Sequence, residues 1–136
     1  MYPPIARYLE RQGFQVATSV RPAAGSAREY DVVGVKPRVR RTVTVEAKIG
    51  HFWRAYNQAL FRLLVSDLVY VSFPHRYAQH VIRTYKDDLA RAGIGLLSVD
   101  GGNVRRALLP QPSEAVNNSR REALITMVVE SEVRRG

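Results

Sequence analysis

The 136-residue chain contains no cysteine. This absence excludes disulfide bonds, thiolate metal sites and a cysteine nucleophile. No apolar run approaches the roughly 20 residues that span a bilayer. The opening MYPPIARYLERQ also lacks the apolar centre of a signal peptide. We therefore expect a cytoplasmic protein with no membrane segment.

Acidic residues and lysines are both scarce. Twelve Asp and Glu residues oppose 21 Lys and Arg residues, so the formal net charge is +9, and only three of the cations are lysines. A positive field attracts polyanions, and the forked guanidinium of arginine suits phosphate contacts. Nucleic acid is the expected partner. The alternative is a lineage preference for arginine on a merely soluble surface.

The remaining composition, 46% hydrophobic and 24% charged, is that of an ordinary globular protein. A chain of this length forms one core more readily than two. We expect one α/β domain over residues 1–110. Residues 111–136 are expected to form a C-terminal helix that packs on the core or docks a partner.

Hydrophobic periodicity and turn residues predict the order of elements. A turn is expected over 21–27, and a basic hairpin loop is expected at Lys36-Pro-Arg38-Val-Arg40-Arg41. Ser119 and Glu122 have the spacing of a capping box at the start of the last helix. The expected helices cover 4–12, 52–65, 76–92 and 119–133, and the expected strands cover 14–20, 29–35, 42–49, 67–73, 94–99 and, at an edge, 104–109.

The most informative stretch is Val43-Thr-Val-Glu-Ala-Lys-Ile-Gly50. Residues i and i+2 of a strand share a face, so Glu46 and Lys48 lie side by side with Cα atoms roughly 7 Å apart. A metal-dependent hydrolase can use Glu46 as a hard oxygen ligand and Lys48 to orient or activate water. A charge pair on a solvated sheet face is the alternative.

A second carboxylate, Asp31, begins the preceding strand, although the apolar residues that follow it give little reason for an acid there. Antiparallel pairing can bring Asp31 and Glu46 to one end of the sheet, where two carboxylates can hold Mg²⁺. Asp31 is alternatively a strand-start residue. Glu29 is a rival for the same metal position.

The helix expected over 52–65 offers a second surface. Its apolar positions, including Leu60 and Leu64, are expected to face the core. Arg54, Gln58 and Arg62 share another face at spacings of four residues and can contact a phosphate backbone. A solvated helix face is the alternative, and for Arg62 it is the preferred interpretation.

His51 and Trp53 follow the motif strand directly. His51 can touch a substrate or lie in an exposed loop. Trp53 can stack on a base, although a tryptophan at a helix start more often packs against the core or a partner.

The run Asp31-Val-Val-Gly, a short loop, Val45-Glu-Ala-Lys48 and a helix that carries Gln58 resembles the PD-(D/E)XK nuclease superfamily. This superfamily has the restriction-endonuclease-like fold of archaeal Holliday junction resolvases. The resemblance covers about residues 5–100 and implies a mixed sheet in the order αβββαβαβ(β)α. One departure is that Tyr30, not proline, precedes Asp31.

The resemblance implies that Asp31 and Glu46 bind divalent metal and that Lys48 assists hydrolysis. It also favours Gln58 as a site residue, and Glu10 as the acid that some members carry on the first helix. The expected cofactor is Mg²⁺, for which Mn²⁺ can substitute. The residues expected to bind nucleic acid are Arg54, Arg62, Lys36, Arg38, Arg40 and Arg41.

The sequence thus predicts a Mg²⁺-dependent endonuclease that hydrolyses DNA, with structured or branched DNA as one candidate substrate. A two-fold homodimer is a natural way to cut both strands of a duplex. Two alternatives stay open. One is a nucleic-acid-binding module that keeps the fold without cleaving, and the other is an assembly subunit that docks through its last helix.

Overall fold

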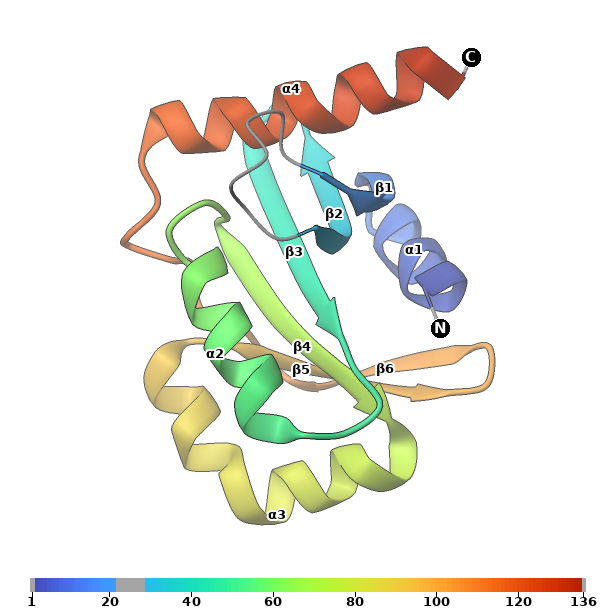
Figure 1. Ribbon diagram of the computed structural model, residues 1–136, viewed down its shortest axis with the longest axis vertical. Coiled ribbons are helices and arrows are strands. Elements are labelled where there is room, and N and C mark those ends of the chain that lie inside the picture. Colours follow the sequence, from blue (N-terminus) through green and yellow to red (C-terminus); the bar gives the residue numbers. More distant parts are fainter. Residues whose placement is uncertain (1, 22–28, 136) are drawn as a thin grey trace.

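A computed structural model describes residues 2–21 and 29–135 and confirms the α/β class (Figure 1). Each expected helix and strand corresponds to an observed element, with ends that differ by three residues or fewer. The turn expected over 21–27 lies, apart from Arg21, outside the described residues. The elements are α1 Tyr2–Arg11, β1 Gln15–Val20, β2 Tyr30–Lys36, β3 Arg41–Ala47, α2 Phe52–Arg62, β4 Leu68–Pro74, α3 His75–Ala92, β5 Gly95–Asp100, β6 Asn103–Leu108 and α4 Asn118–Arg135.

The six strands form one mixed sheet in the sequential order β1-β2-β3-β4-β5-β6. Strands β1, β2 and β3 pair antiparallel, β3, β4 and β5 pair parallel, and β6 returns antiparallel to β5. A parallel pair needs a crossover connection. Helices α2 and α3 supply the two crossovers, from β3 to β4 and from β4 to β5 (Figure 1).

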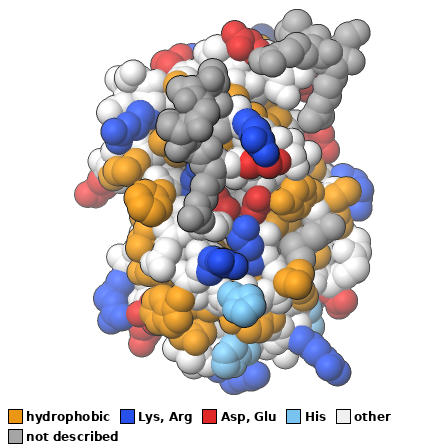
Figure 2. Space-filling view, viewed as in Figure 1, with side chains coloured by type: hydrophobic (Ala, Val, Ile, Leu, Met, Phe, Trp, Pro, Cys, Tyr) orange, Lys and Arg blue, Asp and Glu red, His pale blue; other side chains and the backbone are white. Residues whose placement is uncertain are grey.

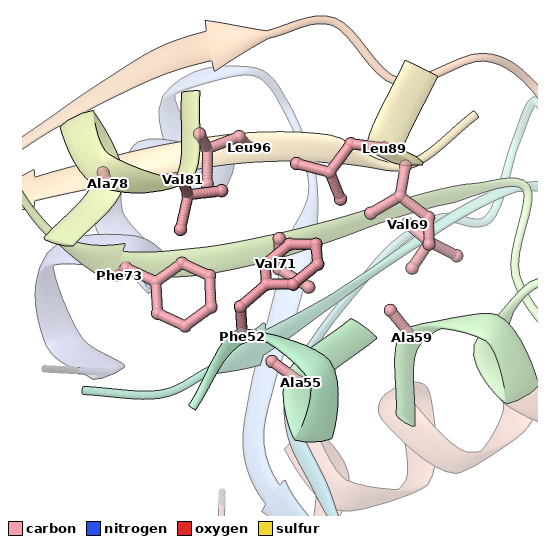
Figure 3. Close-up of a cluster of buried hydrophobic side chains, with 11 residues drawn as sticks. Phe52, Ala55, Ala59, Val69, Val71, Phe73, Ala78, Val81, Leu89 and Leu96 are labelled. Atoms are coloured by element: carbon pink, nitrogen blue, oxygen red, sulfur yellow. The ribbon is translucent and has the colours of Figure 1, made fainter. Parts of the chain in front are cut away.

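Strand β4 separates the two halves of the core. Val69, Val71 and Phe73 pack with residues of α2 and α3, as Figure 3 shows. Tyr70, whose side chain alternates to the other face, packs with residues of α1 such as Leu9. Side chains of a strand point to opposite faces in turn. Burial on both faces explains the near-continuous apolar run of this strand.

Helix α4 covers the β1-β2 side of the sheet. Leu124, Ile125 and Val128 are buried against Ala17 and Val33, among other residues. The C-terminal segment therefore packs on the core, which was one of its two expected roles. None of the helices within the described residues is long and apolar enough to cross a membrane.

The start of α4 corrects the capping-box prediction. The Oδ1 atom of Asn117 accepts a hydrogen bond of 2.8 Å from the backbone N–H of Arg120, so Asn117 caps the helix in place of Ser119. Glu122 does not complete a capping box. It accepts a 2.8 Å hydrogen bond from the Nε atom of Arg40 in the β2-β3 hairpin loop.

Helix α2 presents a different face to the core from the one expected. Its buried residues are Phe52, Ala55, Ala59 and Arg62, whereas Leu60 and Leu64 are 37% and 41% exposed. The buried positions recur at spacings of three and four residues, and the two alanines are small enough to let the helix approach the sheet closely. The interpretation of Arg62 as a residue on a solvated face is therefore wrong.

Candidate functional site

Asp31, Glu46 and Lys48 lie at one edge of the sheet. The last paired residues of β2 and β3 in this direction are Val32 and Val45, so the next residue on each strand is a carboxylate. Strand β3 then leaves the hairpin at Lys48, whose backbone N–H bonds to the carbonyl oxygen of Ser72 in β4 at 3.0 Å. The hairpin register thus brings the three predicted residues to one locus.

Three groups orient the Asp31 carboxylate. The backbone N–H of Ala47 donates to its Oδ2 atom at 2.9 Å, and the Tyr2 hydroxyl donates to its Oδ1 atom at 3.0 Å. The Nζ atom of Lys48 lies 3.5 Å from Oδ2. Because these groups come from β3 and from α1, the fold itself fixes the direction in which Asp31 points.

Glu46 is held by a different partner. The Nε atom of Arg62 donates to its Oε1 atom at 2.7 Å, and Glu46 is only 2% exposed. The Arg62 guanidinium is in turn fixed by the Tyr30 ring, whose centroid lies 3.9 Å away, and by a 3.1 Å bond to the carbonyl oxygen of Glu29. The pair of Glu46 and Arg62 is a buried, rigid unit between α2 and the sheet.

The electrostatics connect the two carboxyl groups. Burial raises the pKa of Glu46 above its ordinary value, the hydrogen bond and charge of Arg62 oppose this rise, and the negative charge of Asp31 adds to it. Burial, together with the charge and hydrogen bond of Asp31, raises the pKa of Tyr2 to about 12. Two negative charges close enough to disfavour each other define a position that attracts a cation.

The carboxylate oxygens of Asp31 and Glu46 are donors of the type that a hard divalent cation prefers. Carboxylate oxygens are the ligands that Mg²⁺ prefers, and Mg²⁺ commonly uses one or two of them while water and a substrate phosphate complete its shell. Within residues 2–21 and 29–135, no group of three or more His, Cys, Asp or Glu side chains gathers as a metal cage. The two carboxylates Asp31 and Glu46 are within the number that a largely hydrated Mg²⁺ uses.

The two other acids that were expected near the metal site, Glu10 and Glu29, have different surroundings. Glu10 is exposed near the end of α1, eight residues or about 12 Å of helical rise beyond Tyr2. The Glu29 side chain lies 3.8 Å from the Nε atom of Arg21, and its backbone carbonyl contacts Arg62. The structure thus separates Glu10 from the Asp31 edge and gives Glu29 a backbone role.

The predicted nucleic-acid contacts fall into two groups. Arg54 is exposed in the first turn of α2, near the end of β3, and Gln58 is half-buried one turn before Arg62. The β2-β3 hairpin loop lies five residues along β2 from Asp31, or about 17 Å away at strand rise. The loop residues therefore do not adjoin the candidate metal site.

Within the hairpin loop, Arg38 and Arg41 are exposed. The Arg40 guanidinium is tied to Glu122 and to the carbonyl oxygen of Pro37, and the Lys36 ammonium lies 4.6 Å from the centroid of the Phe14 ring. Arg62 is the one predicted contact that the structure corrects, because its guanidinium is engaged in the buried unit with Glu46.

The sequence reasoning missed one residue of the site, Tyr2, and gave another, Arg62, a different role. Tyr2 precedes two prolines at a helix start, and nothing in its surroundings indicates a carboxylate partner. Arg62 had a usable signal, since it continues the small-residue face of Ala55 and Ala59 at helical spacing. An arginine on such a face predicts a buried acidic partner.

No protein-family model matches the sequence, and no curated protein matches it. Among solved structures, a protein described as "SPO1766 protein of unknown function from Silicibacter pomeroyi" is similar, with a TM-score of 0.73 and 22% identity. The match covers 98% of this chain and 84% of that chain. At this identity the likeness extends to the fold alone.

Proposed function

We propose that this protein is a metal-dependent nuclease that hydrolyses DNA phosphodiester bonds at the edge formed by Asp31, Glu46 and Lys48. The observation that carries the proposal is the meeting of two carboxyl groups and a lysine where β2 begins and β3 ends. The charge of Asp31 raises the pKa of Glu46, and the Nζ atom of Lys48 is 3.5 Å from Asp31. A buried acid with a raised pKa beside a second acid is typical of a functional site.

The arrangement of elements supports the finer assignment to the restriction-endonuclease-like fold. An antiparallel hairpin, β2 and β3, presents the acids, and a helix then leads to a parallel strand beside β3. This is the context in which the PD-(D/E)XK resemblance assigns metal binding to Asp31 and Glu46 and assistance of hydrolysis to Lys48.

Each residue has a distinct task in the proposed mechanism. Asp31 and Glu46 would hold Mg²⁺ or Mn²⁺, which would supply Lewis-acid stabilisation of the charge that develops on the phosphate. Tyr2 and the Ala47 N–H keep Asp31 in its rotamer, so little reorganisation is needed on binding. The Lys48 ammonium places a further positive charge beside Asp31, where it binds phosphate or orients the attacking water.

The positive surface supports DNA as the substrate. The net charge of +9 and the exposed Arg38, Arg41 and Arg54 favour a polyanion. DNA affinity without metal should fall as salt rises, by about 0.9 log unit per contacted phosphate for each log unit of salt. We also propose a homodimer for paired cuts and a cytoplasmic location.

One observation favours a second candidate function, a nucleic-acid-binding module that does not cleave. Arg62 already donates a 2.7 Å hydrogen bond to Glu46, which is only 2% exposed. The charge of Arg62 offsets part of the cost of burying Glu46 without any metal. The Arg62 pair must open, or leave the second oxygen of Glu46 accessible, before Glu46 can act as a ligand.

The test is single-turnover cleavage of labelled branched, duplex and single-stranded DNA in Mg²⁺, Mn²⁺ or EDTA. Cleavage should require metal, and Lys48→Ala should lower its rate by 10²-fold or more while metal binding persists. Lys86→Ala, which removes an exposed lysine on α3, is the matched control and should cleave normally. Salt-dependent DNA binding with no cleavage in any metal would favour the binding module instead.

A further inference from the structure

Trp53 is a large aromatic side chain that the fold leaves half exposed. It is 49% exposed in the first turn of α2, although its neighbour Phe52 is buried. The expectation that it packs against the core is met in part, because about half of the residue stays exposed. On the face seen in Figure 2, hydrophobic, histidine and cationic side chains adjoin one another over the half of the molecule that holds α2 and α3.

Three rings fix the plane of the Trp53 indole. Its centroid lies 5.0 Å from Phe52, 5.3 Å from Tyr56 and 5.3 Å from Tyr85, in each case edge to face. Tyr85 of α3 stacks on Phe52 at 4.0 Å, which anchors the cluster to the core. Edge-to-face contacts hold a ring in place. Trp53 is therefore a preorganised aromatic surface.

Basic residues lie on the two helices that carry this aromatic surface. Arg54 follows Trp53 on α2 and is exposed. On α3, the His80 ring contacts Tyr85 at 5.9 Å, and the exposed Arg76 and Arg83 lie one turn before and one turn after His80. A rigid aromatic ring with positive charge around it is the combination that binds single-stranded nucleic acid.

The aromatic surface adjoins the proposed metal site along the chain. His51, with φ of 59°, turns the chain from β3 into α2, so Trp53 follows Lys48 by five residues at the same edge of the sheet. Five residues span at most about 18 Å, so the indole ring is within reach of a nucleotide near a phosphate held at Asp31 and Glu46.

We propose that Trp53 stacks on an unpaired nucleobase, so that the substrate class is DNA with a single-stranded or unpaired segment beside the bound phosphate. This inference rests on the proposed function and names its substrate. A second copy of the chain is a poorer occupant of the same surface. A two-fold contact centred on Trp53 would bring Arg54, the next residue on α2, close to its own symmetry mate.

The chain has a single tryptophan, so its fluorescence reports directly on this position. With EDTA present, a short oligo-dT strand should quench Trp53 fluorescence at low salt, and a blunt duplex of equal length should quench it much less. Unchanged fluorescence with oligo-dT would overturn the proposal. A change that depends on protein concentration, in the absence of DNA, would instead assign the surface to a second copy and would also overturn it.

Anisotropy of labelled oligo-dT supplies the matching affinities. Trp53→Ala should weaken binding by about 5- to 150-fold, the range for loss of one stacked base. Trp53→Phe keeps a ring and should retain most of the affinity, which separates stacking from a folding defect. Phe61→Ala, at a 72% exposed position two turns along α2, is the control and should bind normally. Equal binding by Trp53→Ala and the unmodified protein would overturn the proposal.

The result is independent of hydrolysis because no metal is present. Quenching without cleavage in any metal would leave the stacking site in place and remove the nuclease. Cleavage without quenching would remove the stacking site and leave the nuclease in place.

Discussion

An arginine-carboxylate pair lies near each end of strand β3. Near its beginning, the Nη2 atom of Arg121 in α4 lies 2.7 Å from Asp67, which also bonds to Thr42, and near its end, the Nε atom of Arg62 lies 2.7 Å from Glu46. The two bonds have the same length, but the surroundings lower the pKa of Asp67 and raise that of Glu46. The comparison separates a structural ion pair from a candidate functional one.

Asp67 is saturated with donors. It accepts hydrogen bonds from the backbone N–H and the hydroxyl of Thr42, both at 2.9 Å, and from two nitrogens of Arg121. Burial opposes its ionisation, but the hydrogen bonds from Arg121 and Thr42 outweigh burial, and the pKa of Asp67 is held below its ordinary value. This pair ties α4 to the strands.

Glu46 has fewer compensating groups. Burial raises its pKa, and Arg62 and Lys48 do not fully compensate, in part because Asp31 adds a second negative charge. A protein that needed only stability would favour a saturated pair such as Asp67 and Arg121 at both ends. The raised pKa of Glu46 is what the proposed cation site at Asp31 and Glu46 would produce.

The largest expected effect comes from breaking the pair at Glu46. Arg62→Met should lower the free energy of unfolding by about 3–5 kcal/mol at pH 7, because it leaves a buried carboxylate without its partner. The loss should shrink toward pH 4.5. Without Arg62 the folded pKa of Glu46 rises further above its ordinary 4.5, and a raised carboxyl pKa costs stability only as pH climbs above the unfolded value.

Urea unfolding at pH 7 and pH 5 measures this difference. Arg54→Met, on the same helix at an exposed position, should change the free energy of unfolding by no more than about 0.5 kcal/mol. If Arg62→Met were as stable as Arg54→Met, the ion pair between Arg62 and Glu46 would not contribute to the free energy of unfolding.

A smaller effect is expected at the other end of β3. Asp67→Asn should lower the free energy of unfolding by about 1–3 kcal/mol at pH 7, because the charge-assisted bonds from Arg121 are lost. The folded pKa of Asp67 lies below its unfolded value of 3.8. Its stabilisation is therefore present above that value and disappears as pH falls through the folded pKa.

Denaturant unfolding at pH 7 and pH 3 should show the two proteins converging in acid. The exposed Asp100→Asn is the control for removal of one negative charge. A difference in unfolding free energy that grows in acid would contradict the lowered pKa of Asp67.

The smallest expected effect concerns the hydroxyl that orients Asp31. Tyr2→Phe should lower the free energy of unfolding by about 1 kcal/mol near neutral pH, the usual weight of one hydrogen bond. The pKa of Tyr2 is raised from 10.0 to about 12. The stabilisation that this shift represents is complete below pH 10 and is lost as pH rises through 12.

Unfolding of the unmodified protein and Tyr2→Phe at pH 8 and pH 11.5 tests this pH dependence, with Tyr8→Phe on the same helix as the control. The two proteins should converge at the higher pH. A constant difference across this range would show that Tyr2 acts by packing and not through Asp31.

Much of the fold and part of the site follow from the sequence by simple rules. The four-residue turn between Lys36 and Arg41 sets the hairpin register, and that register by itself carries Asp31 and Glu46 to the same edge. Gly13 and Gly93, which adopt positive φ readily, indicated the ends of α1 and α3.

Other features depend on tertiary contacts that no local pattern contains. Tyr2 reaches Asp31 from a helix 29 residues earlier in the chain. Asn117 caps α4 although Ser119 and Glu122 have the spacing of a capping box. The reason is that the helix begins at Asn118, one residue before its expected start. The orientation of α2 was missed because the larger hydrophobicity of its leucines predicted that they face the core. Close packing of the helix on the sheet instead favours the small alanines at the contact.

The central claim is that Asp31 and Glu46 form a site for a divalent cation, and calorimetric titration with Mg²⁺ and Mn²⁺ tests it most directly. Asp31→Asn and Glu46→Gln should each weaken cation binding strongly, because each removes a negative charge from a hard-cation site while keeping its shape. Asp67→Asn is the matched control, a carboxylate also bonded to arginine at 2.7 Å near the other end of β3, and it should bind the cation like the unmodified protein. Equal binding by all four proteins, or no binding by the unmodified one, would contradict the claim.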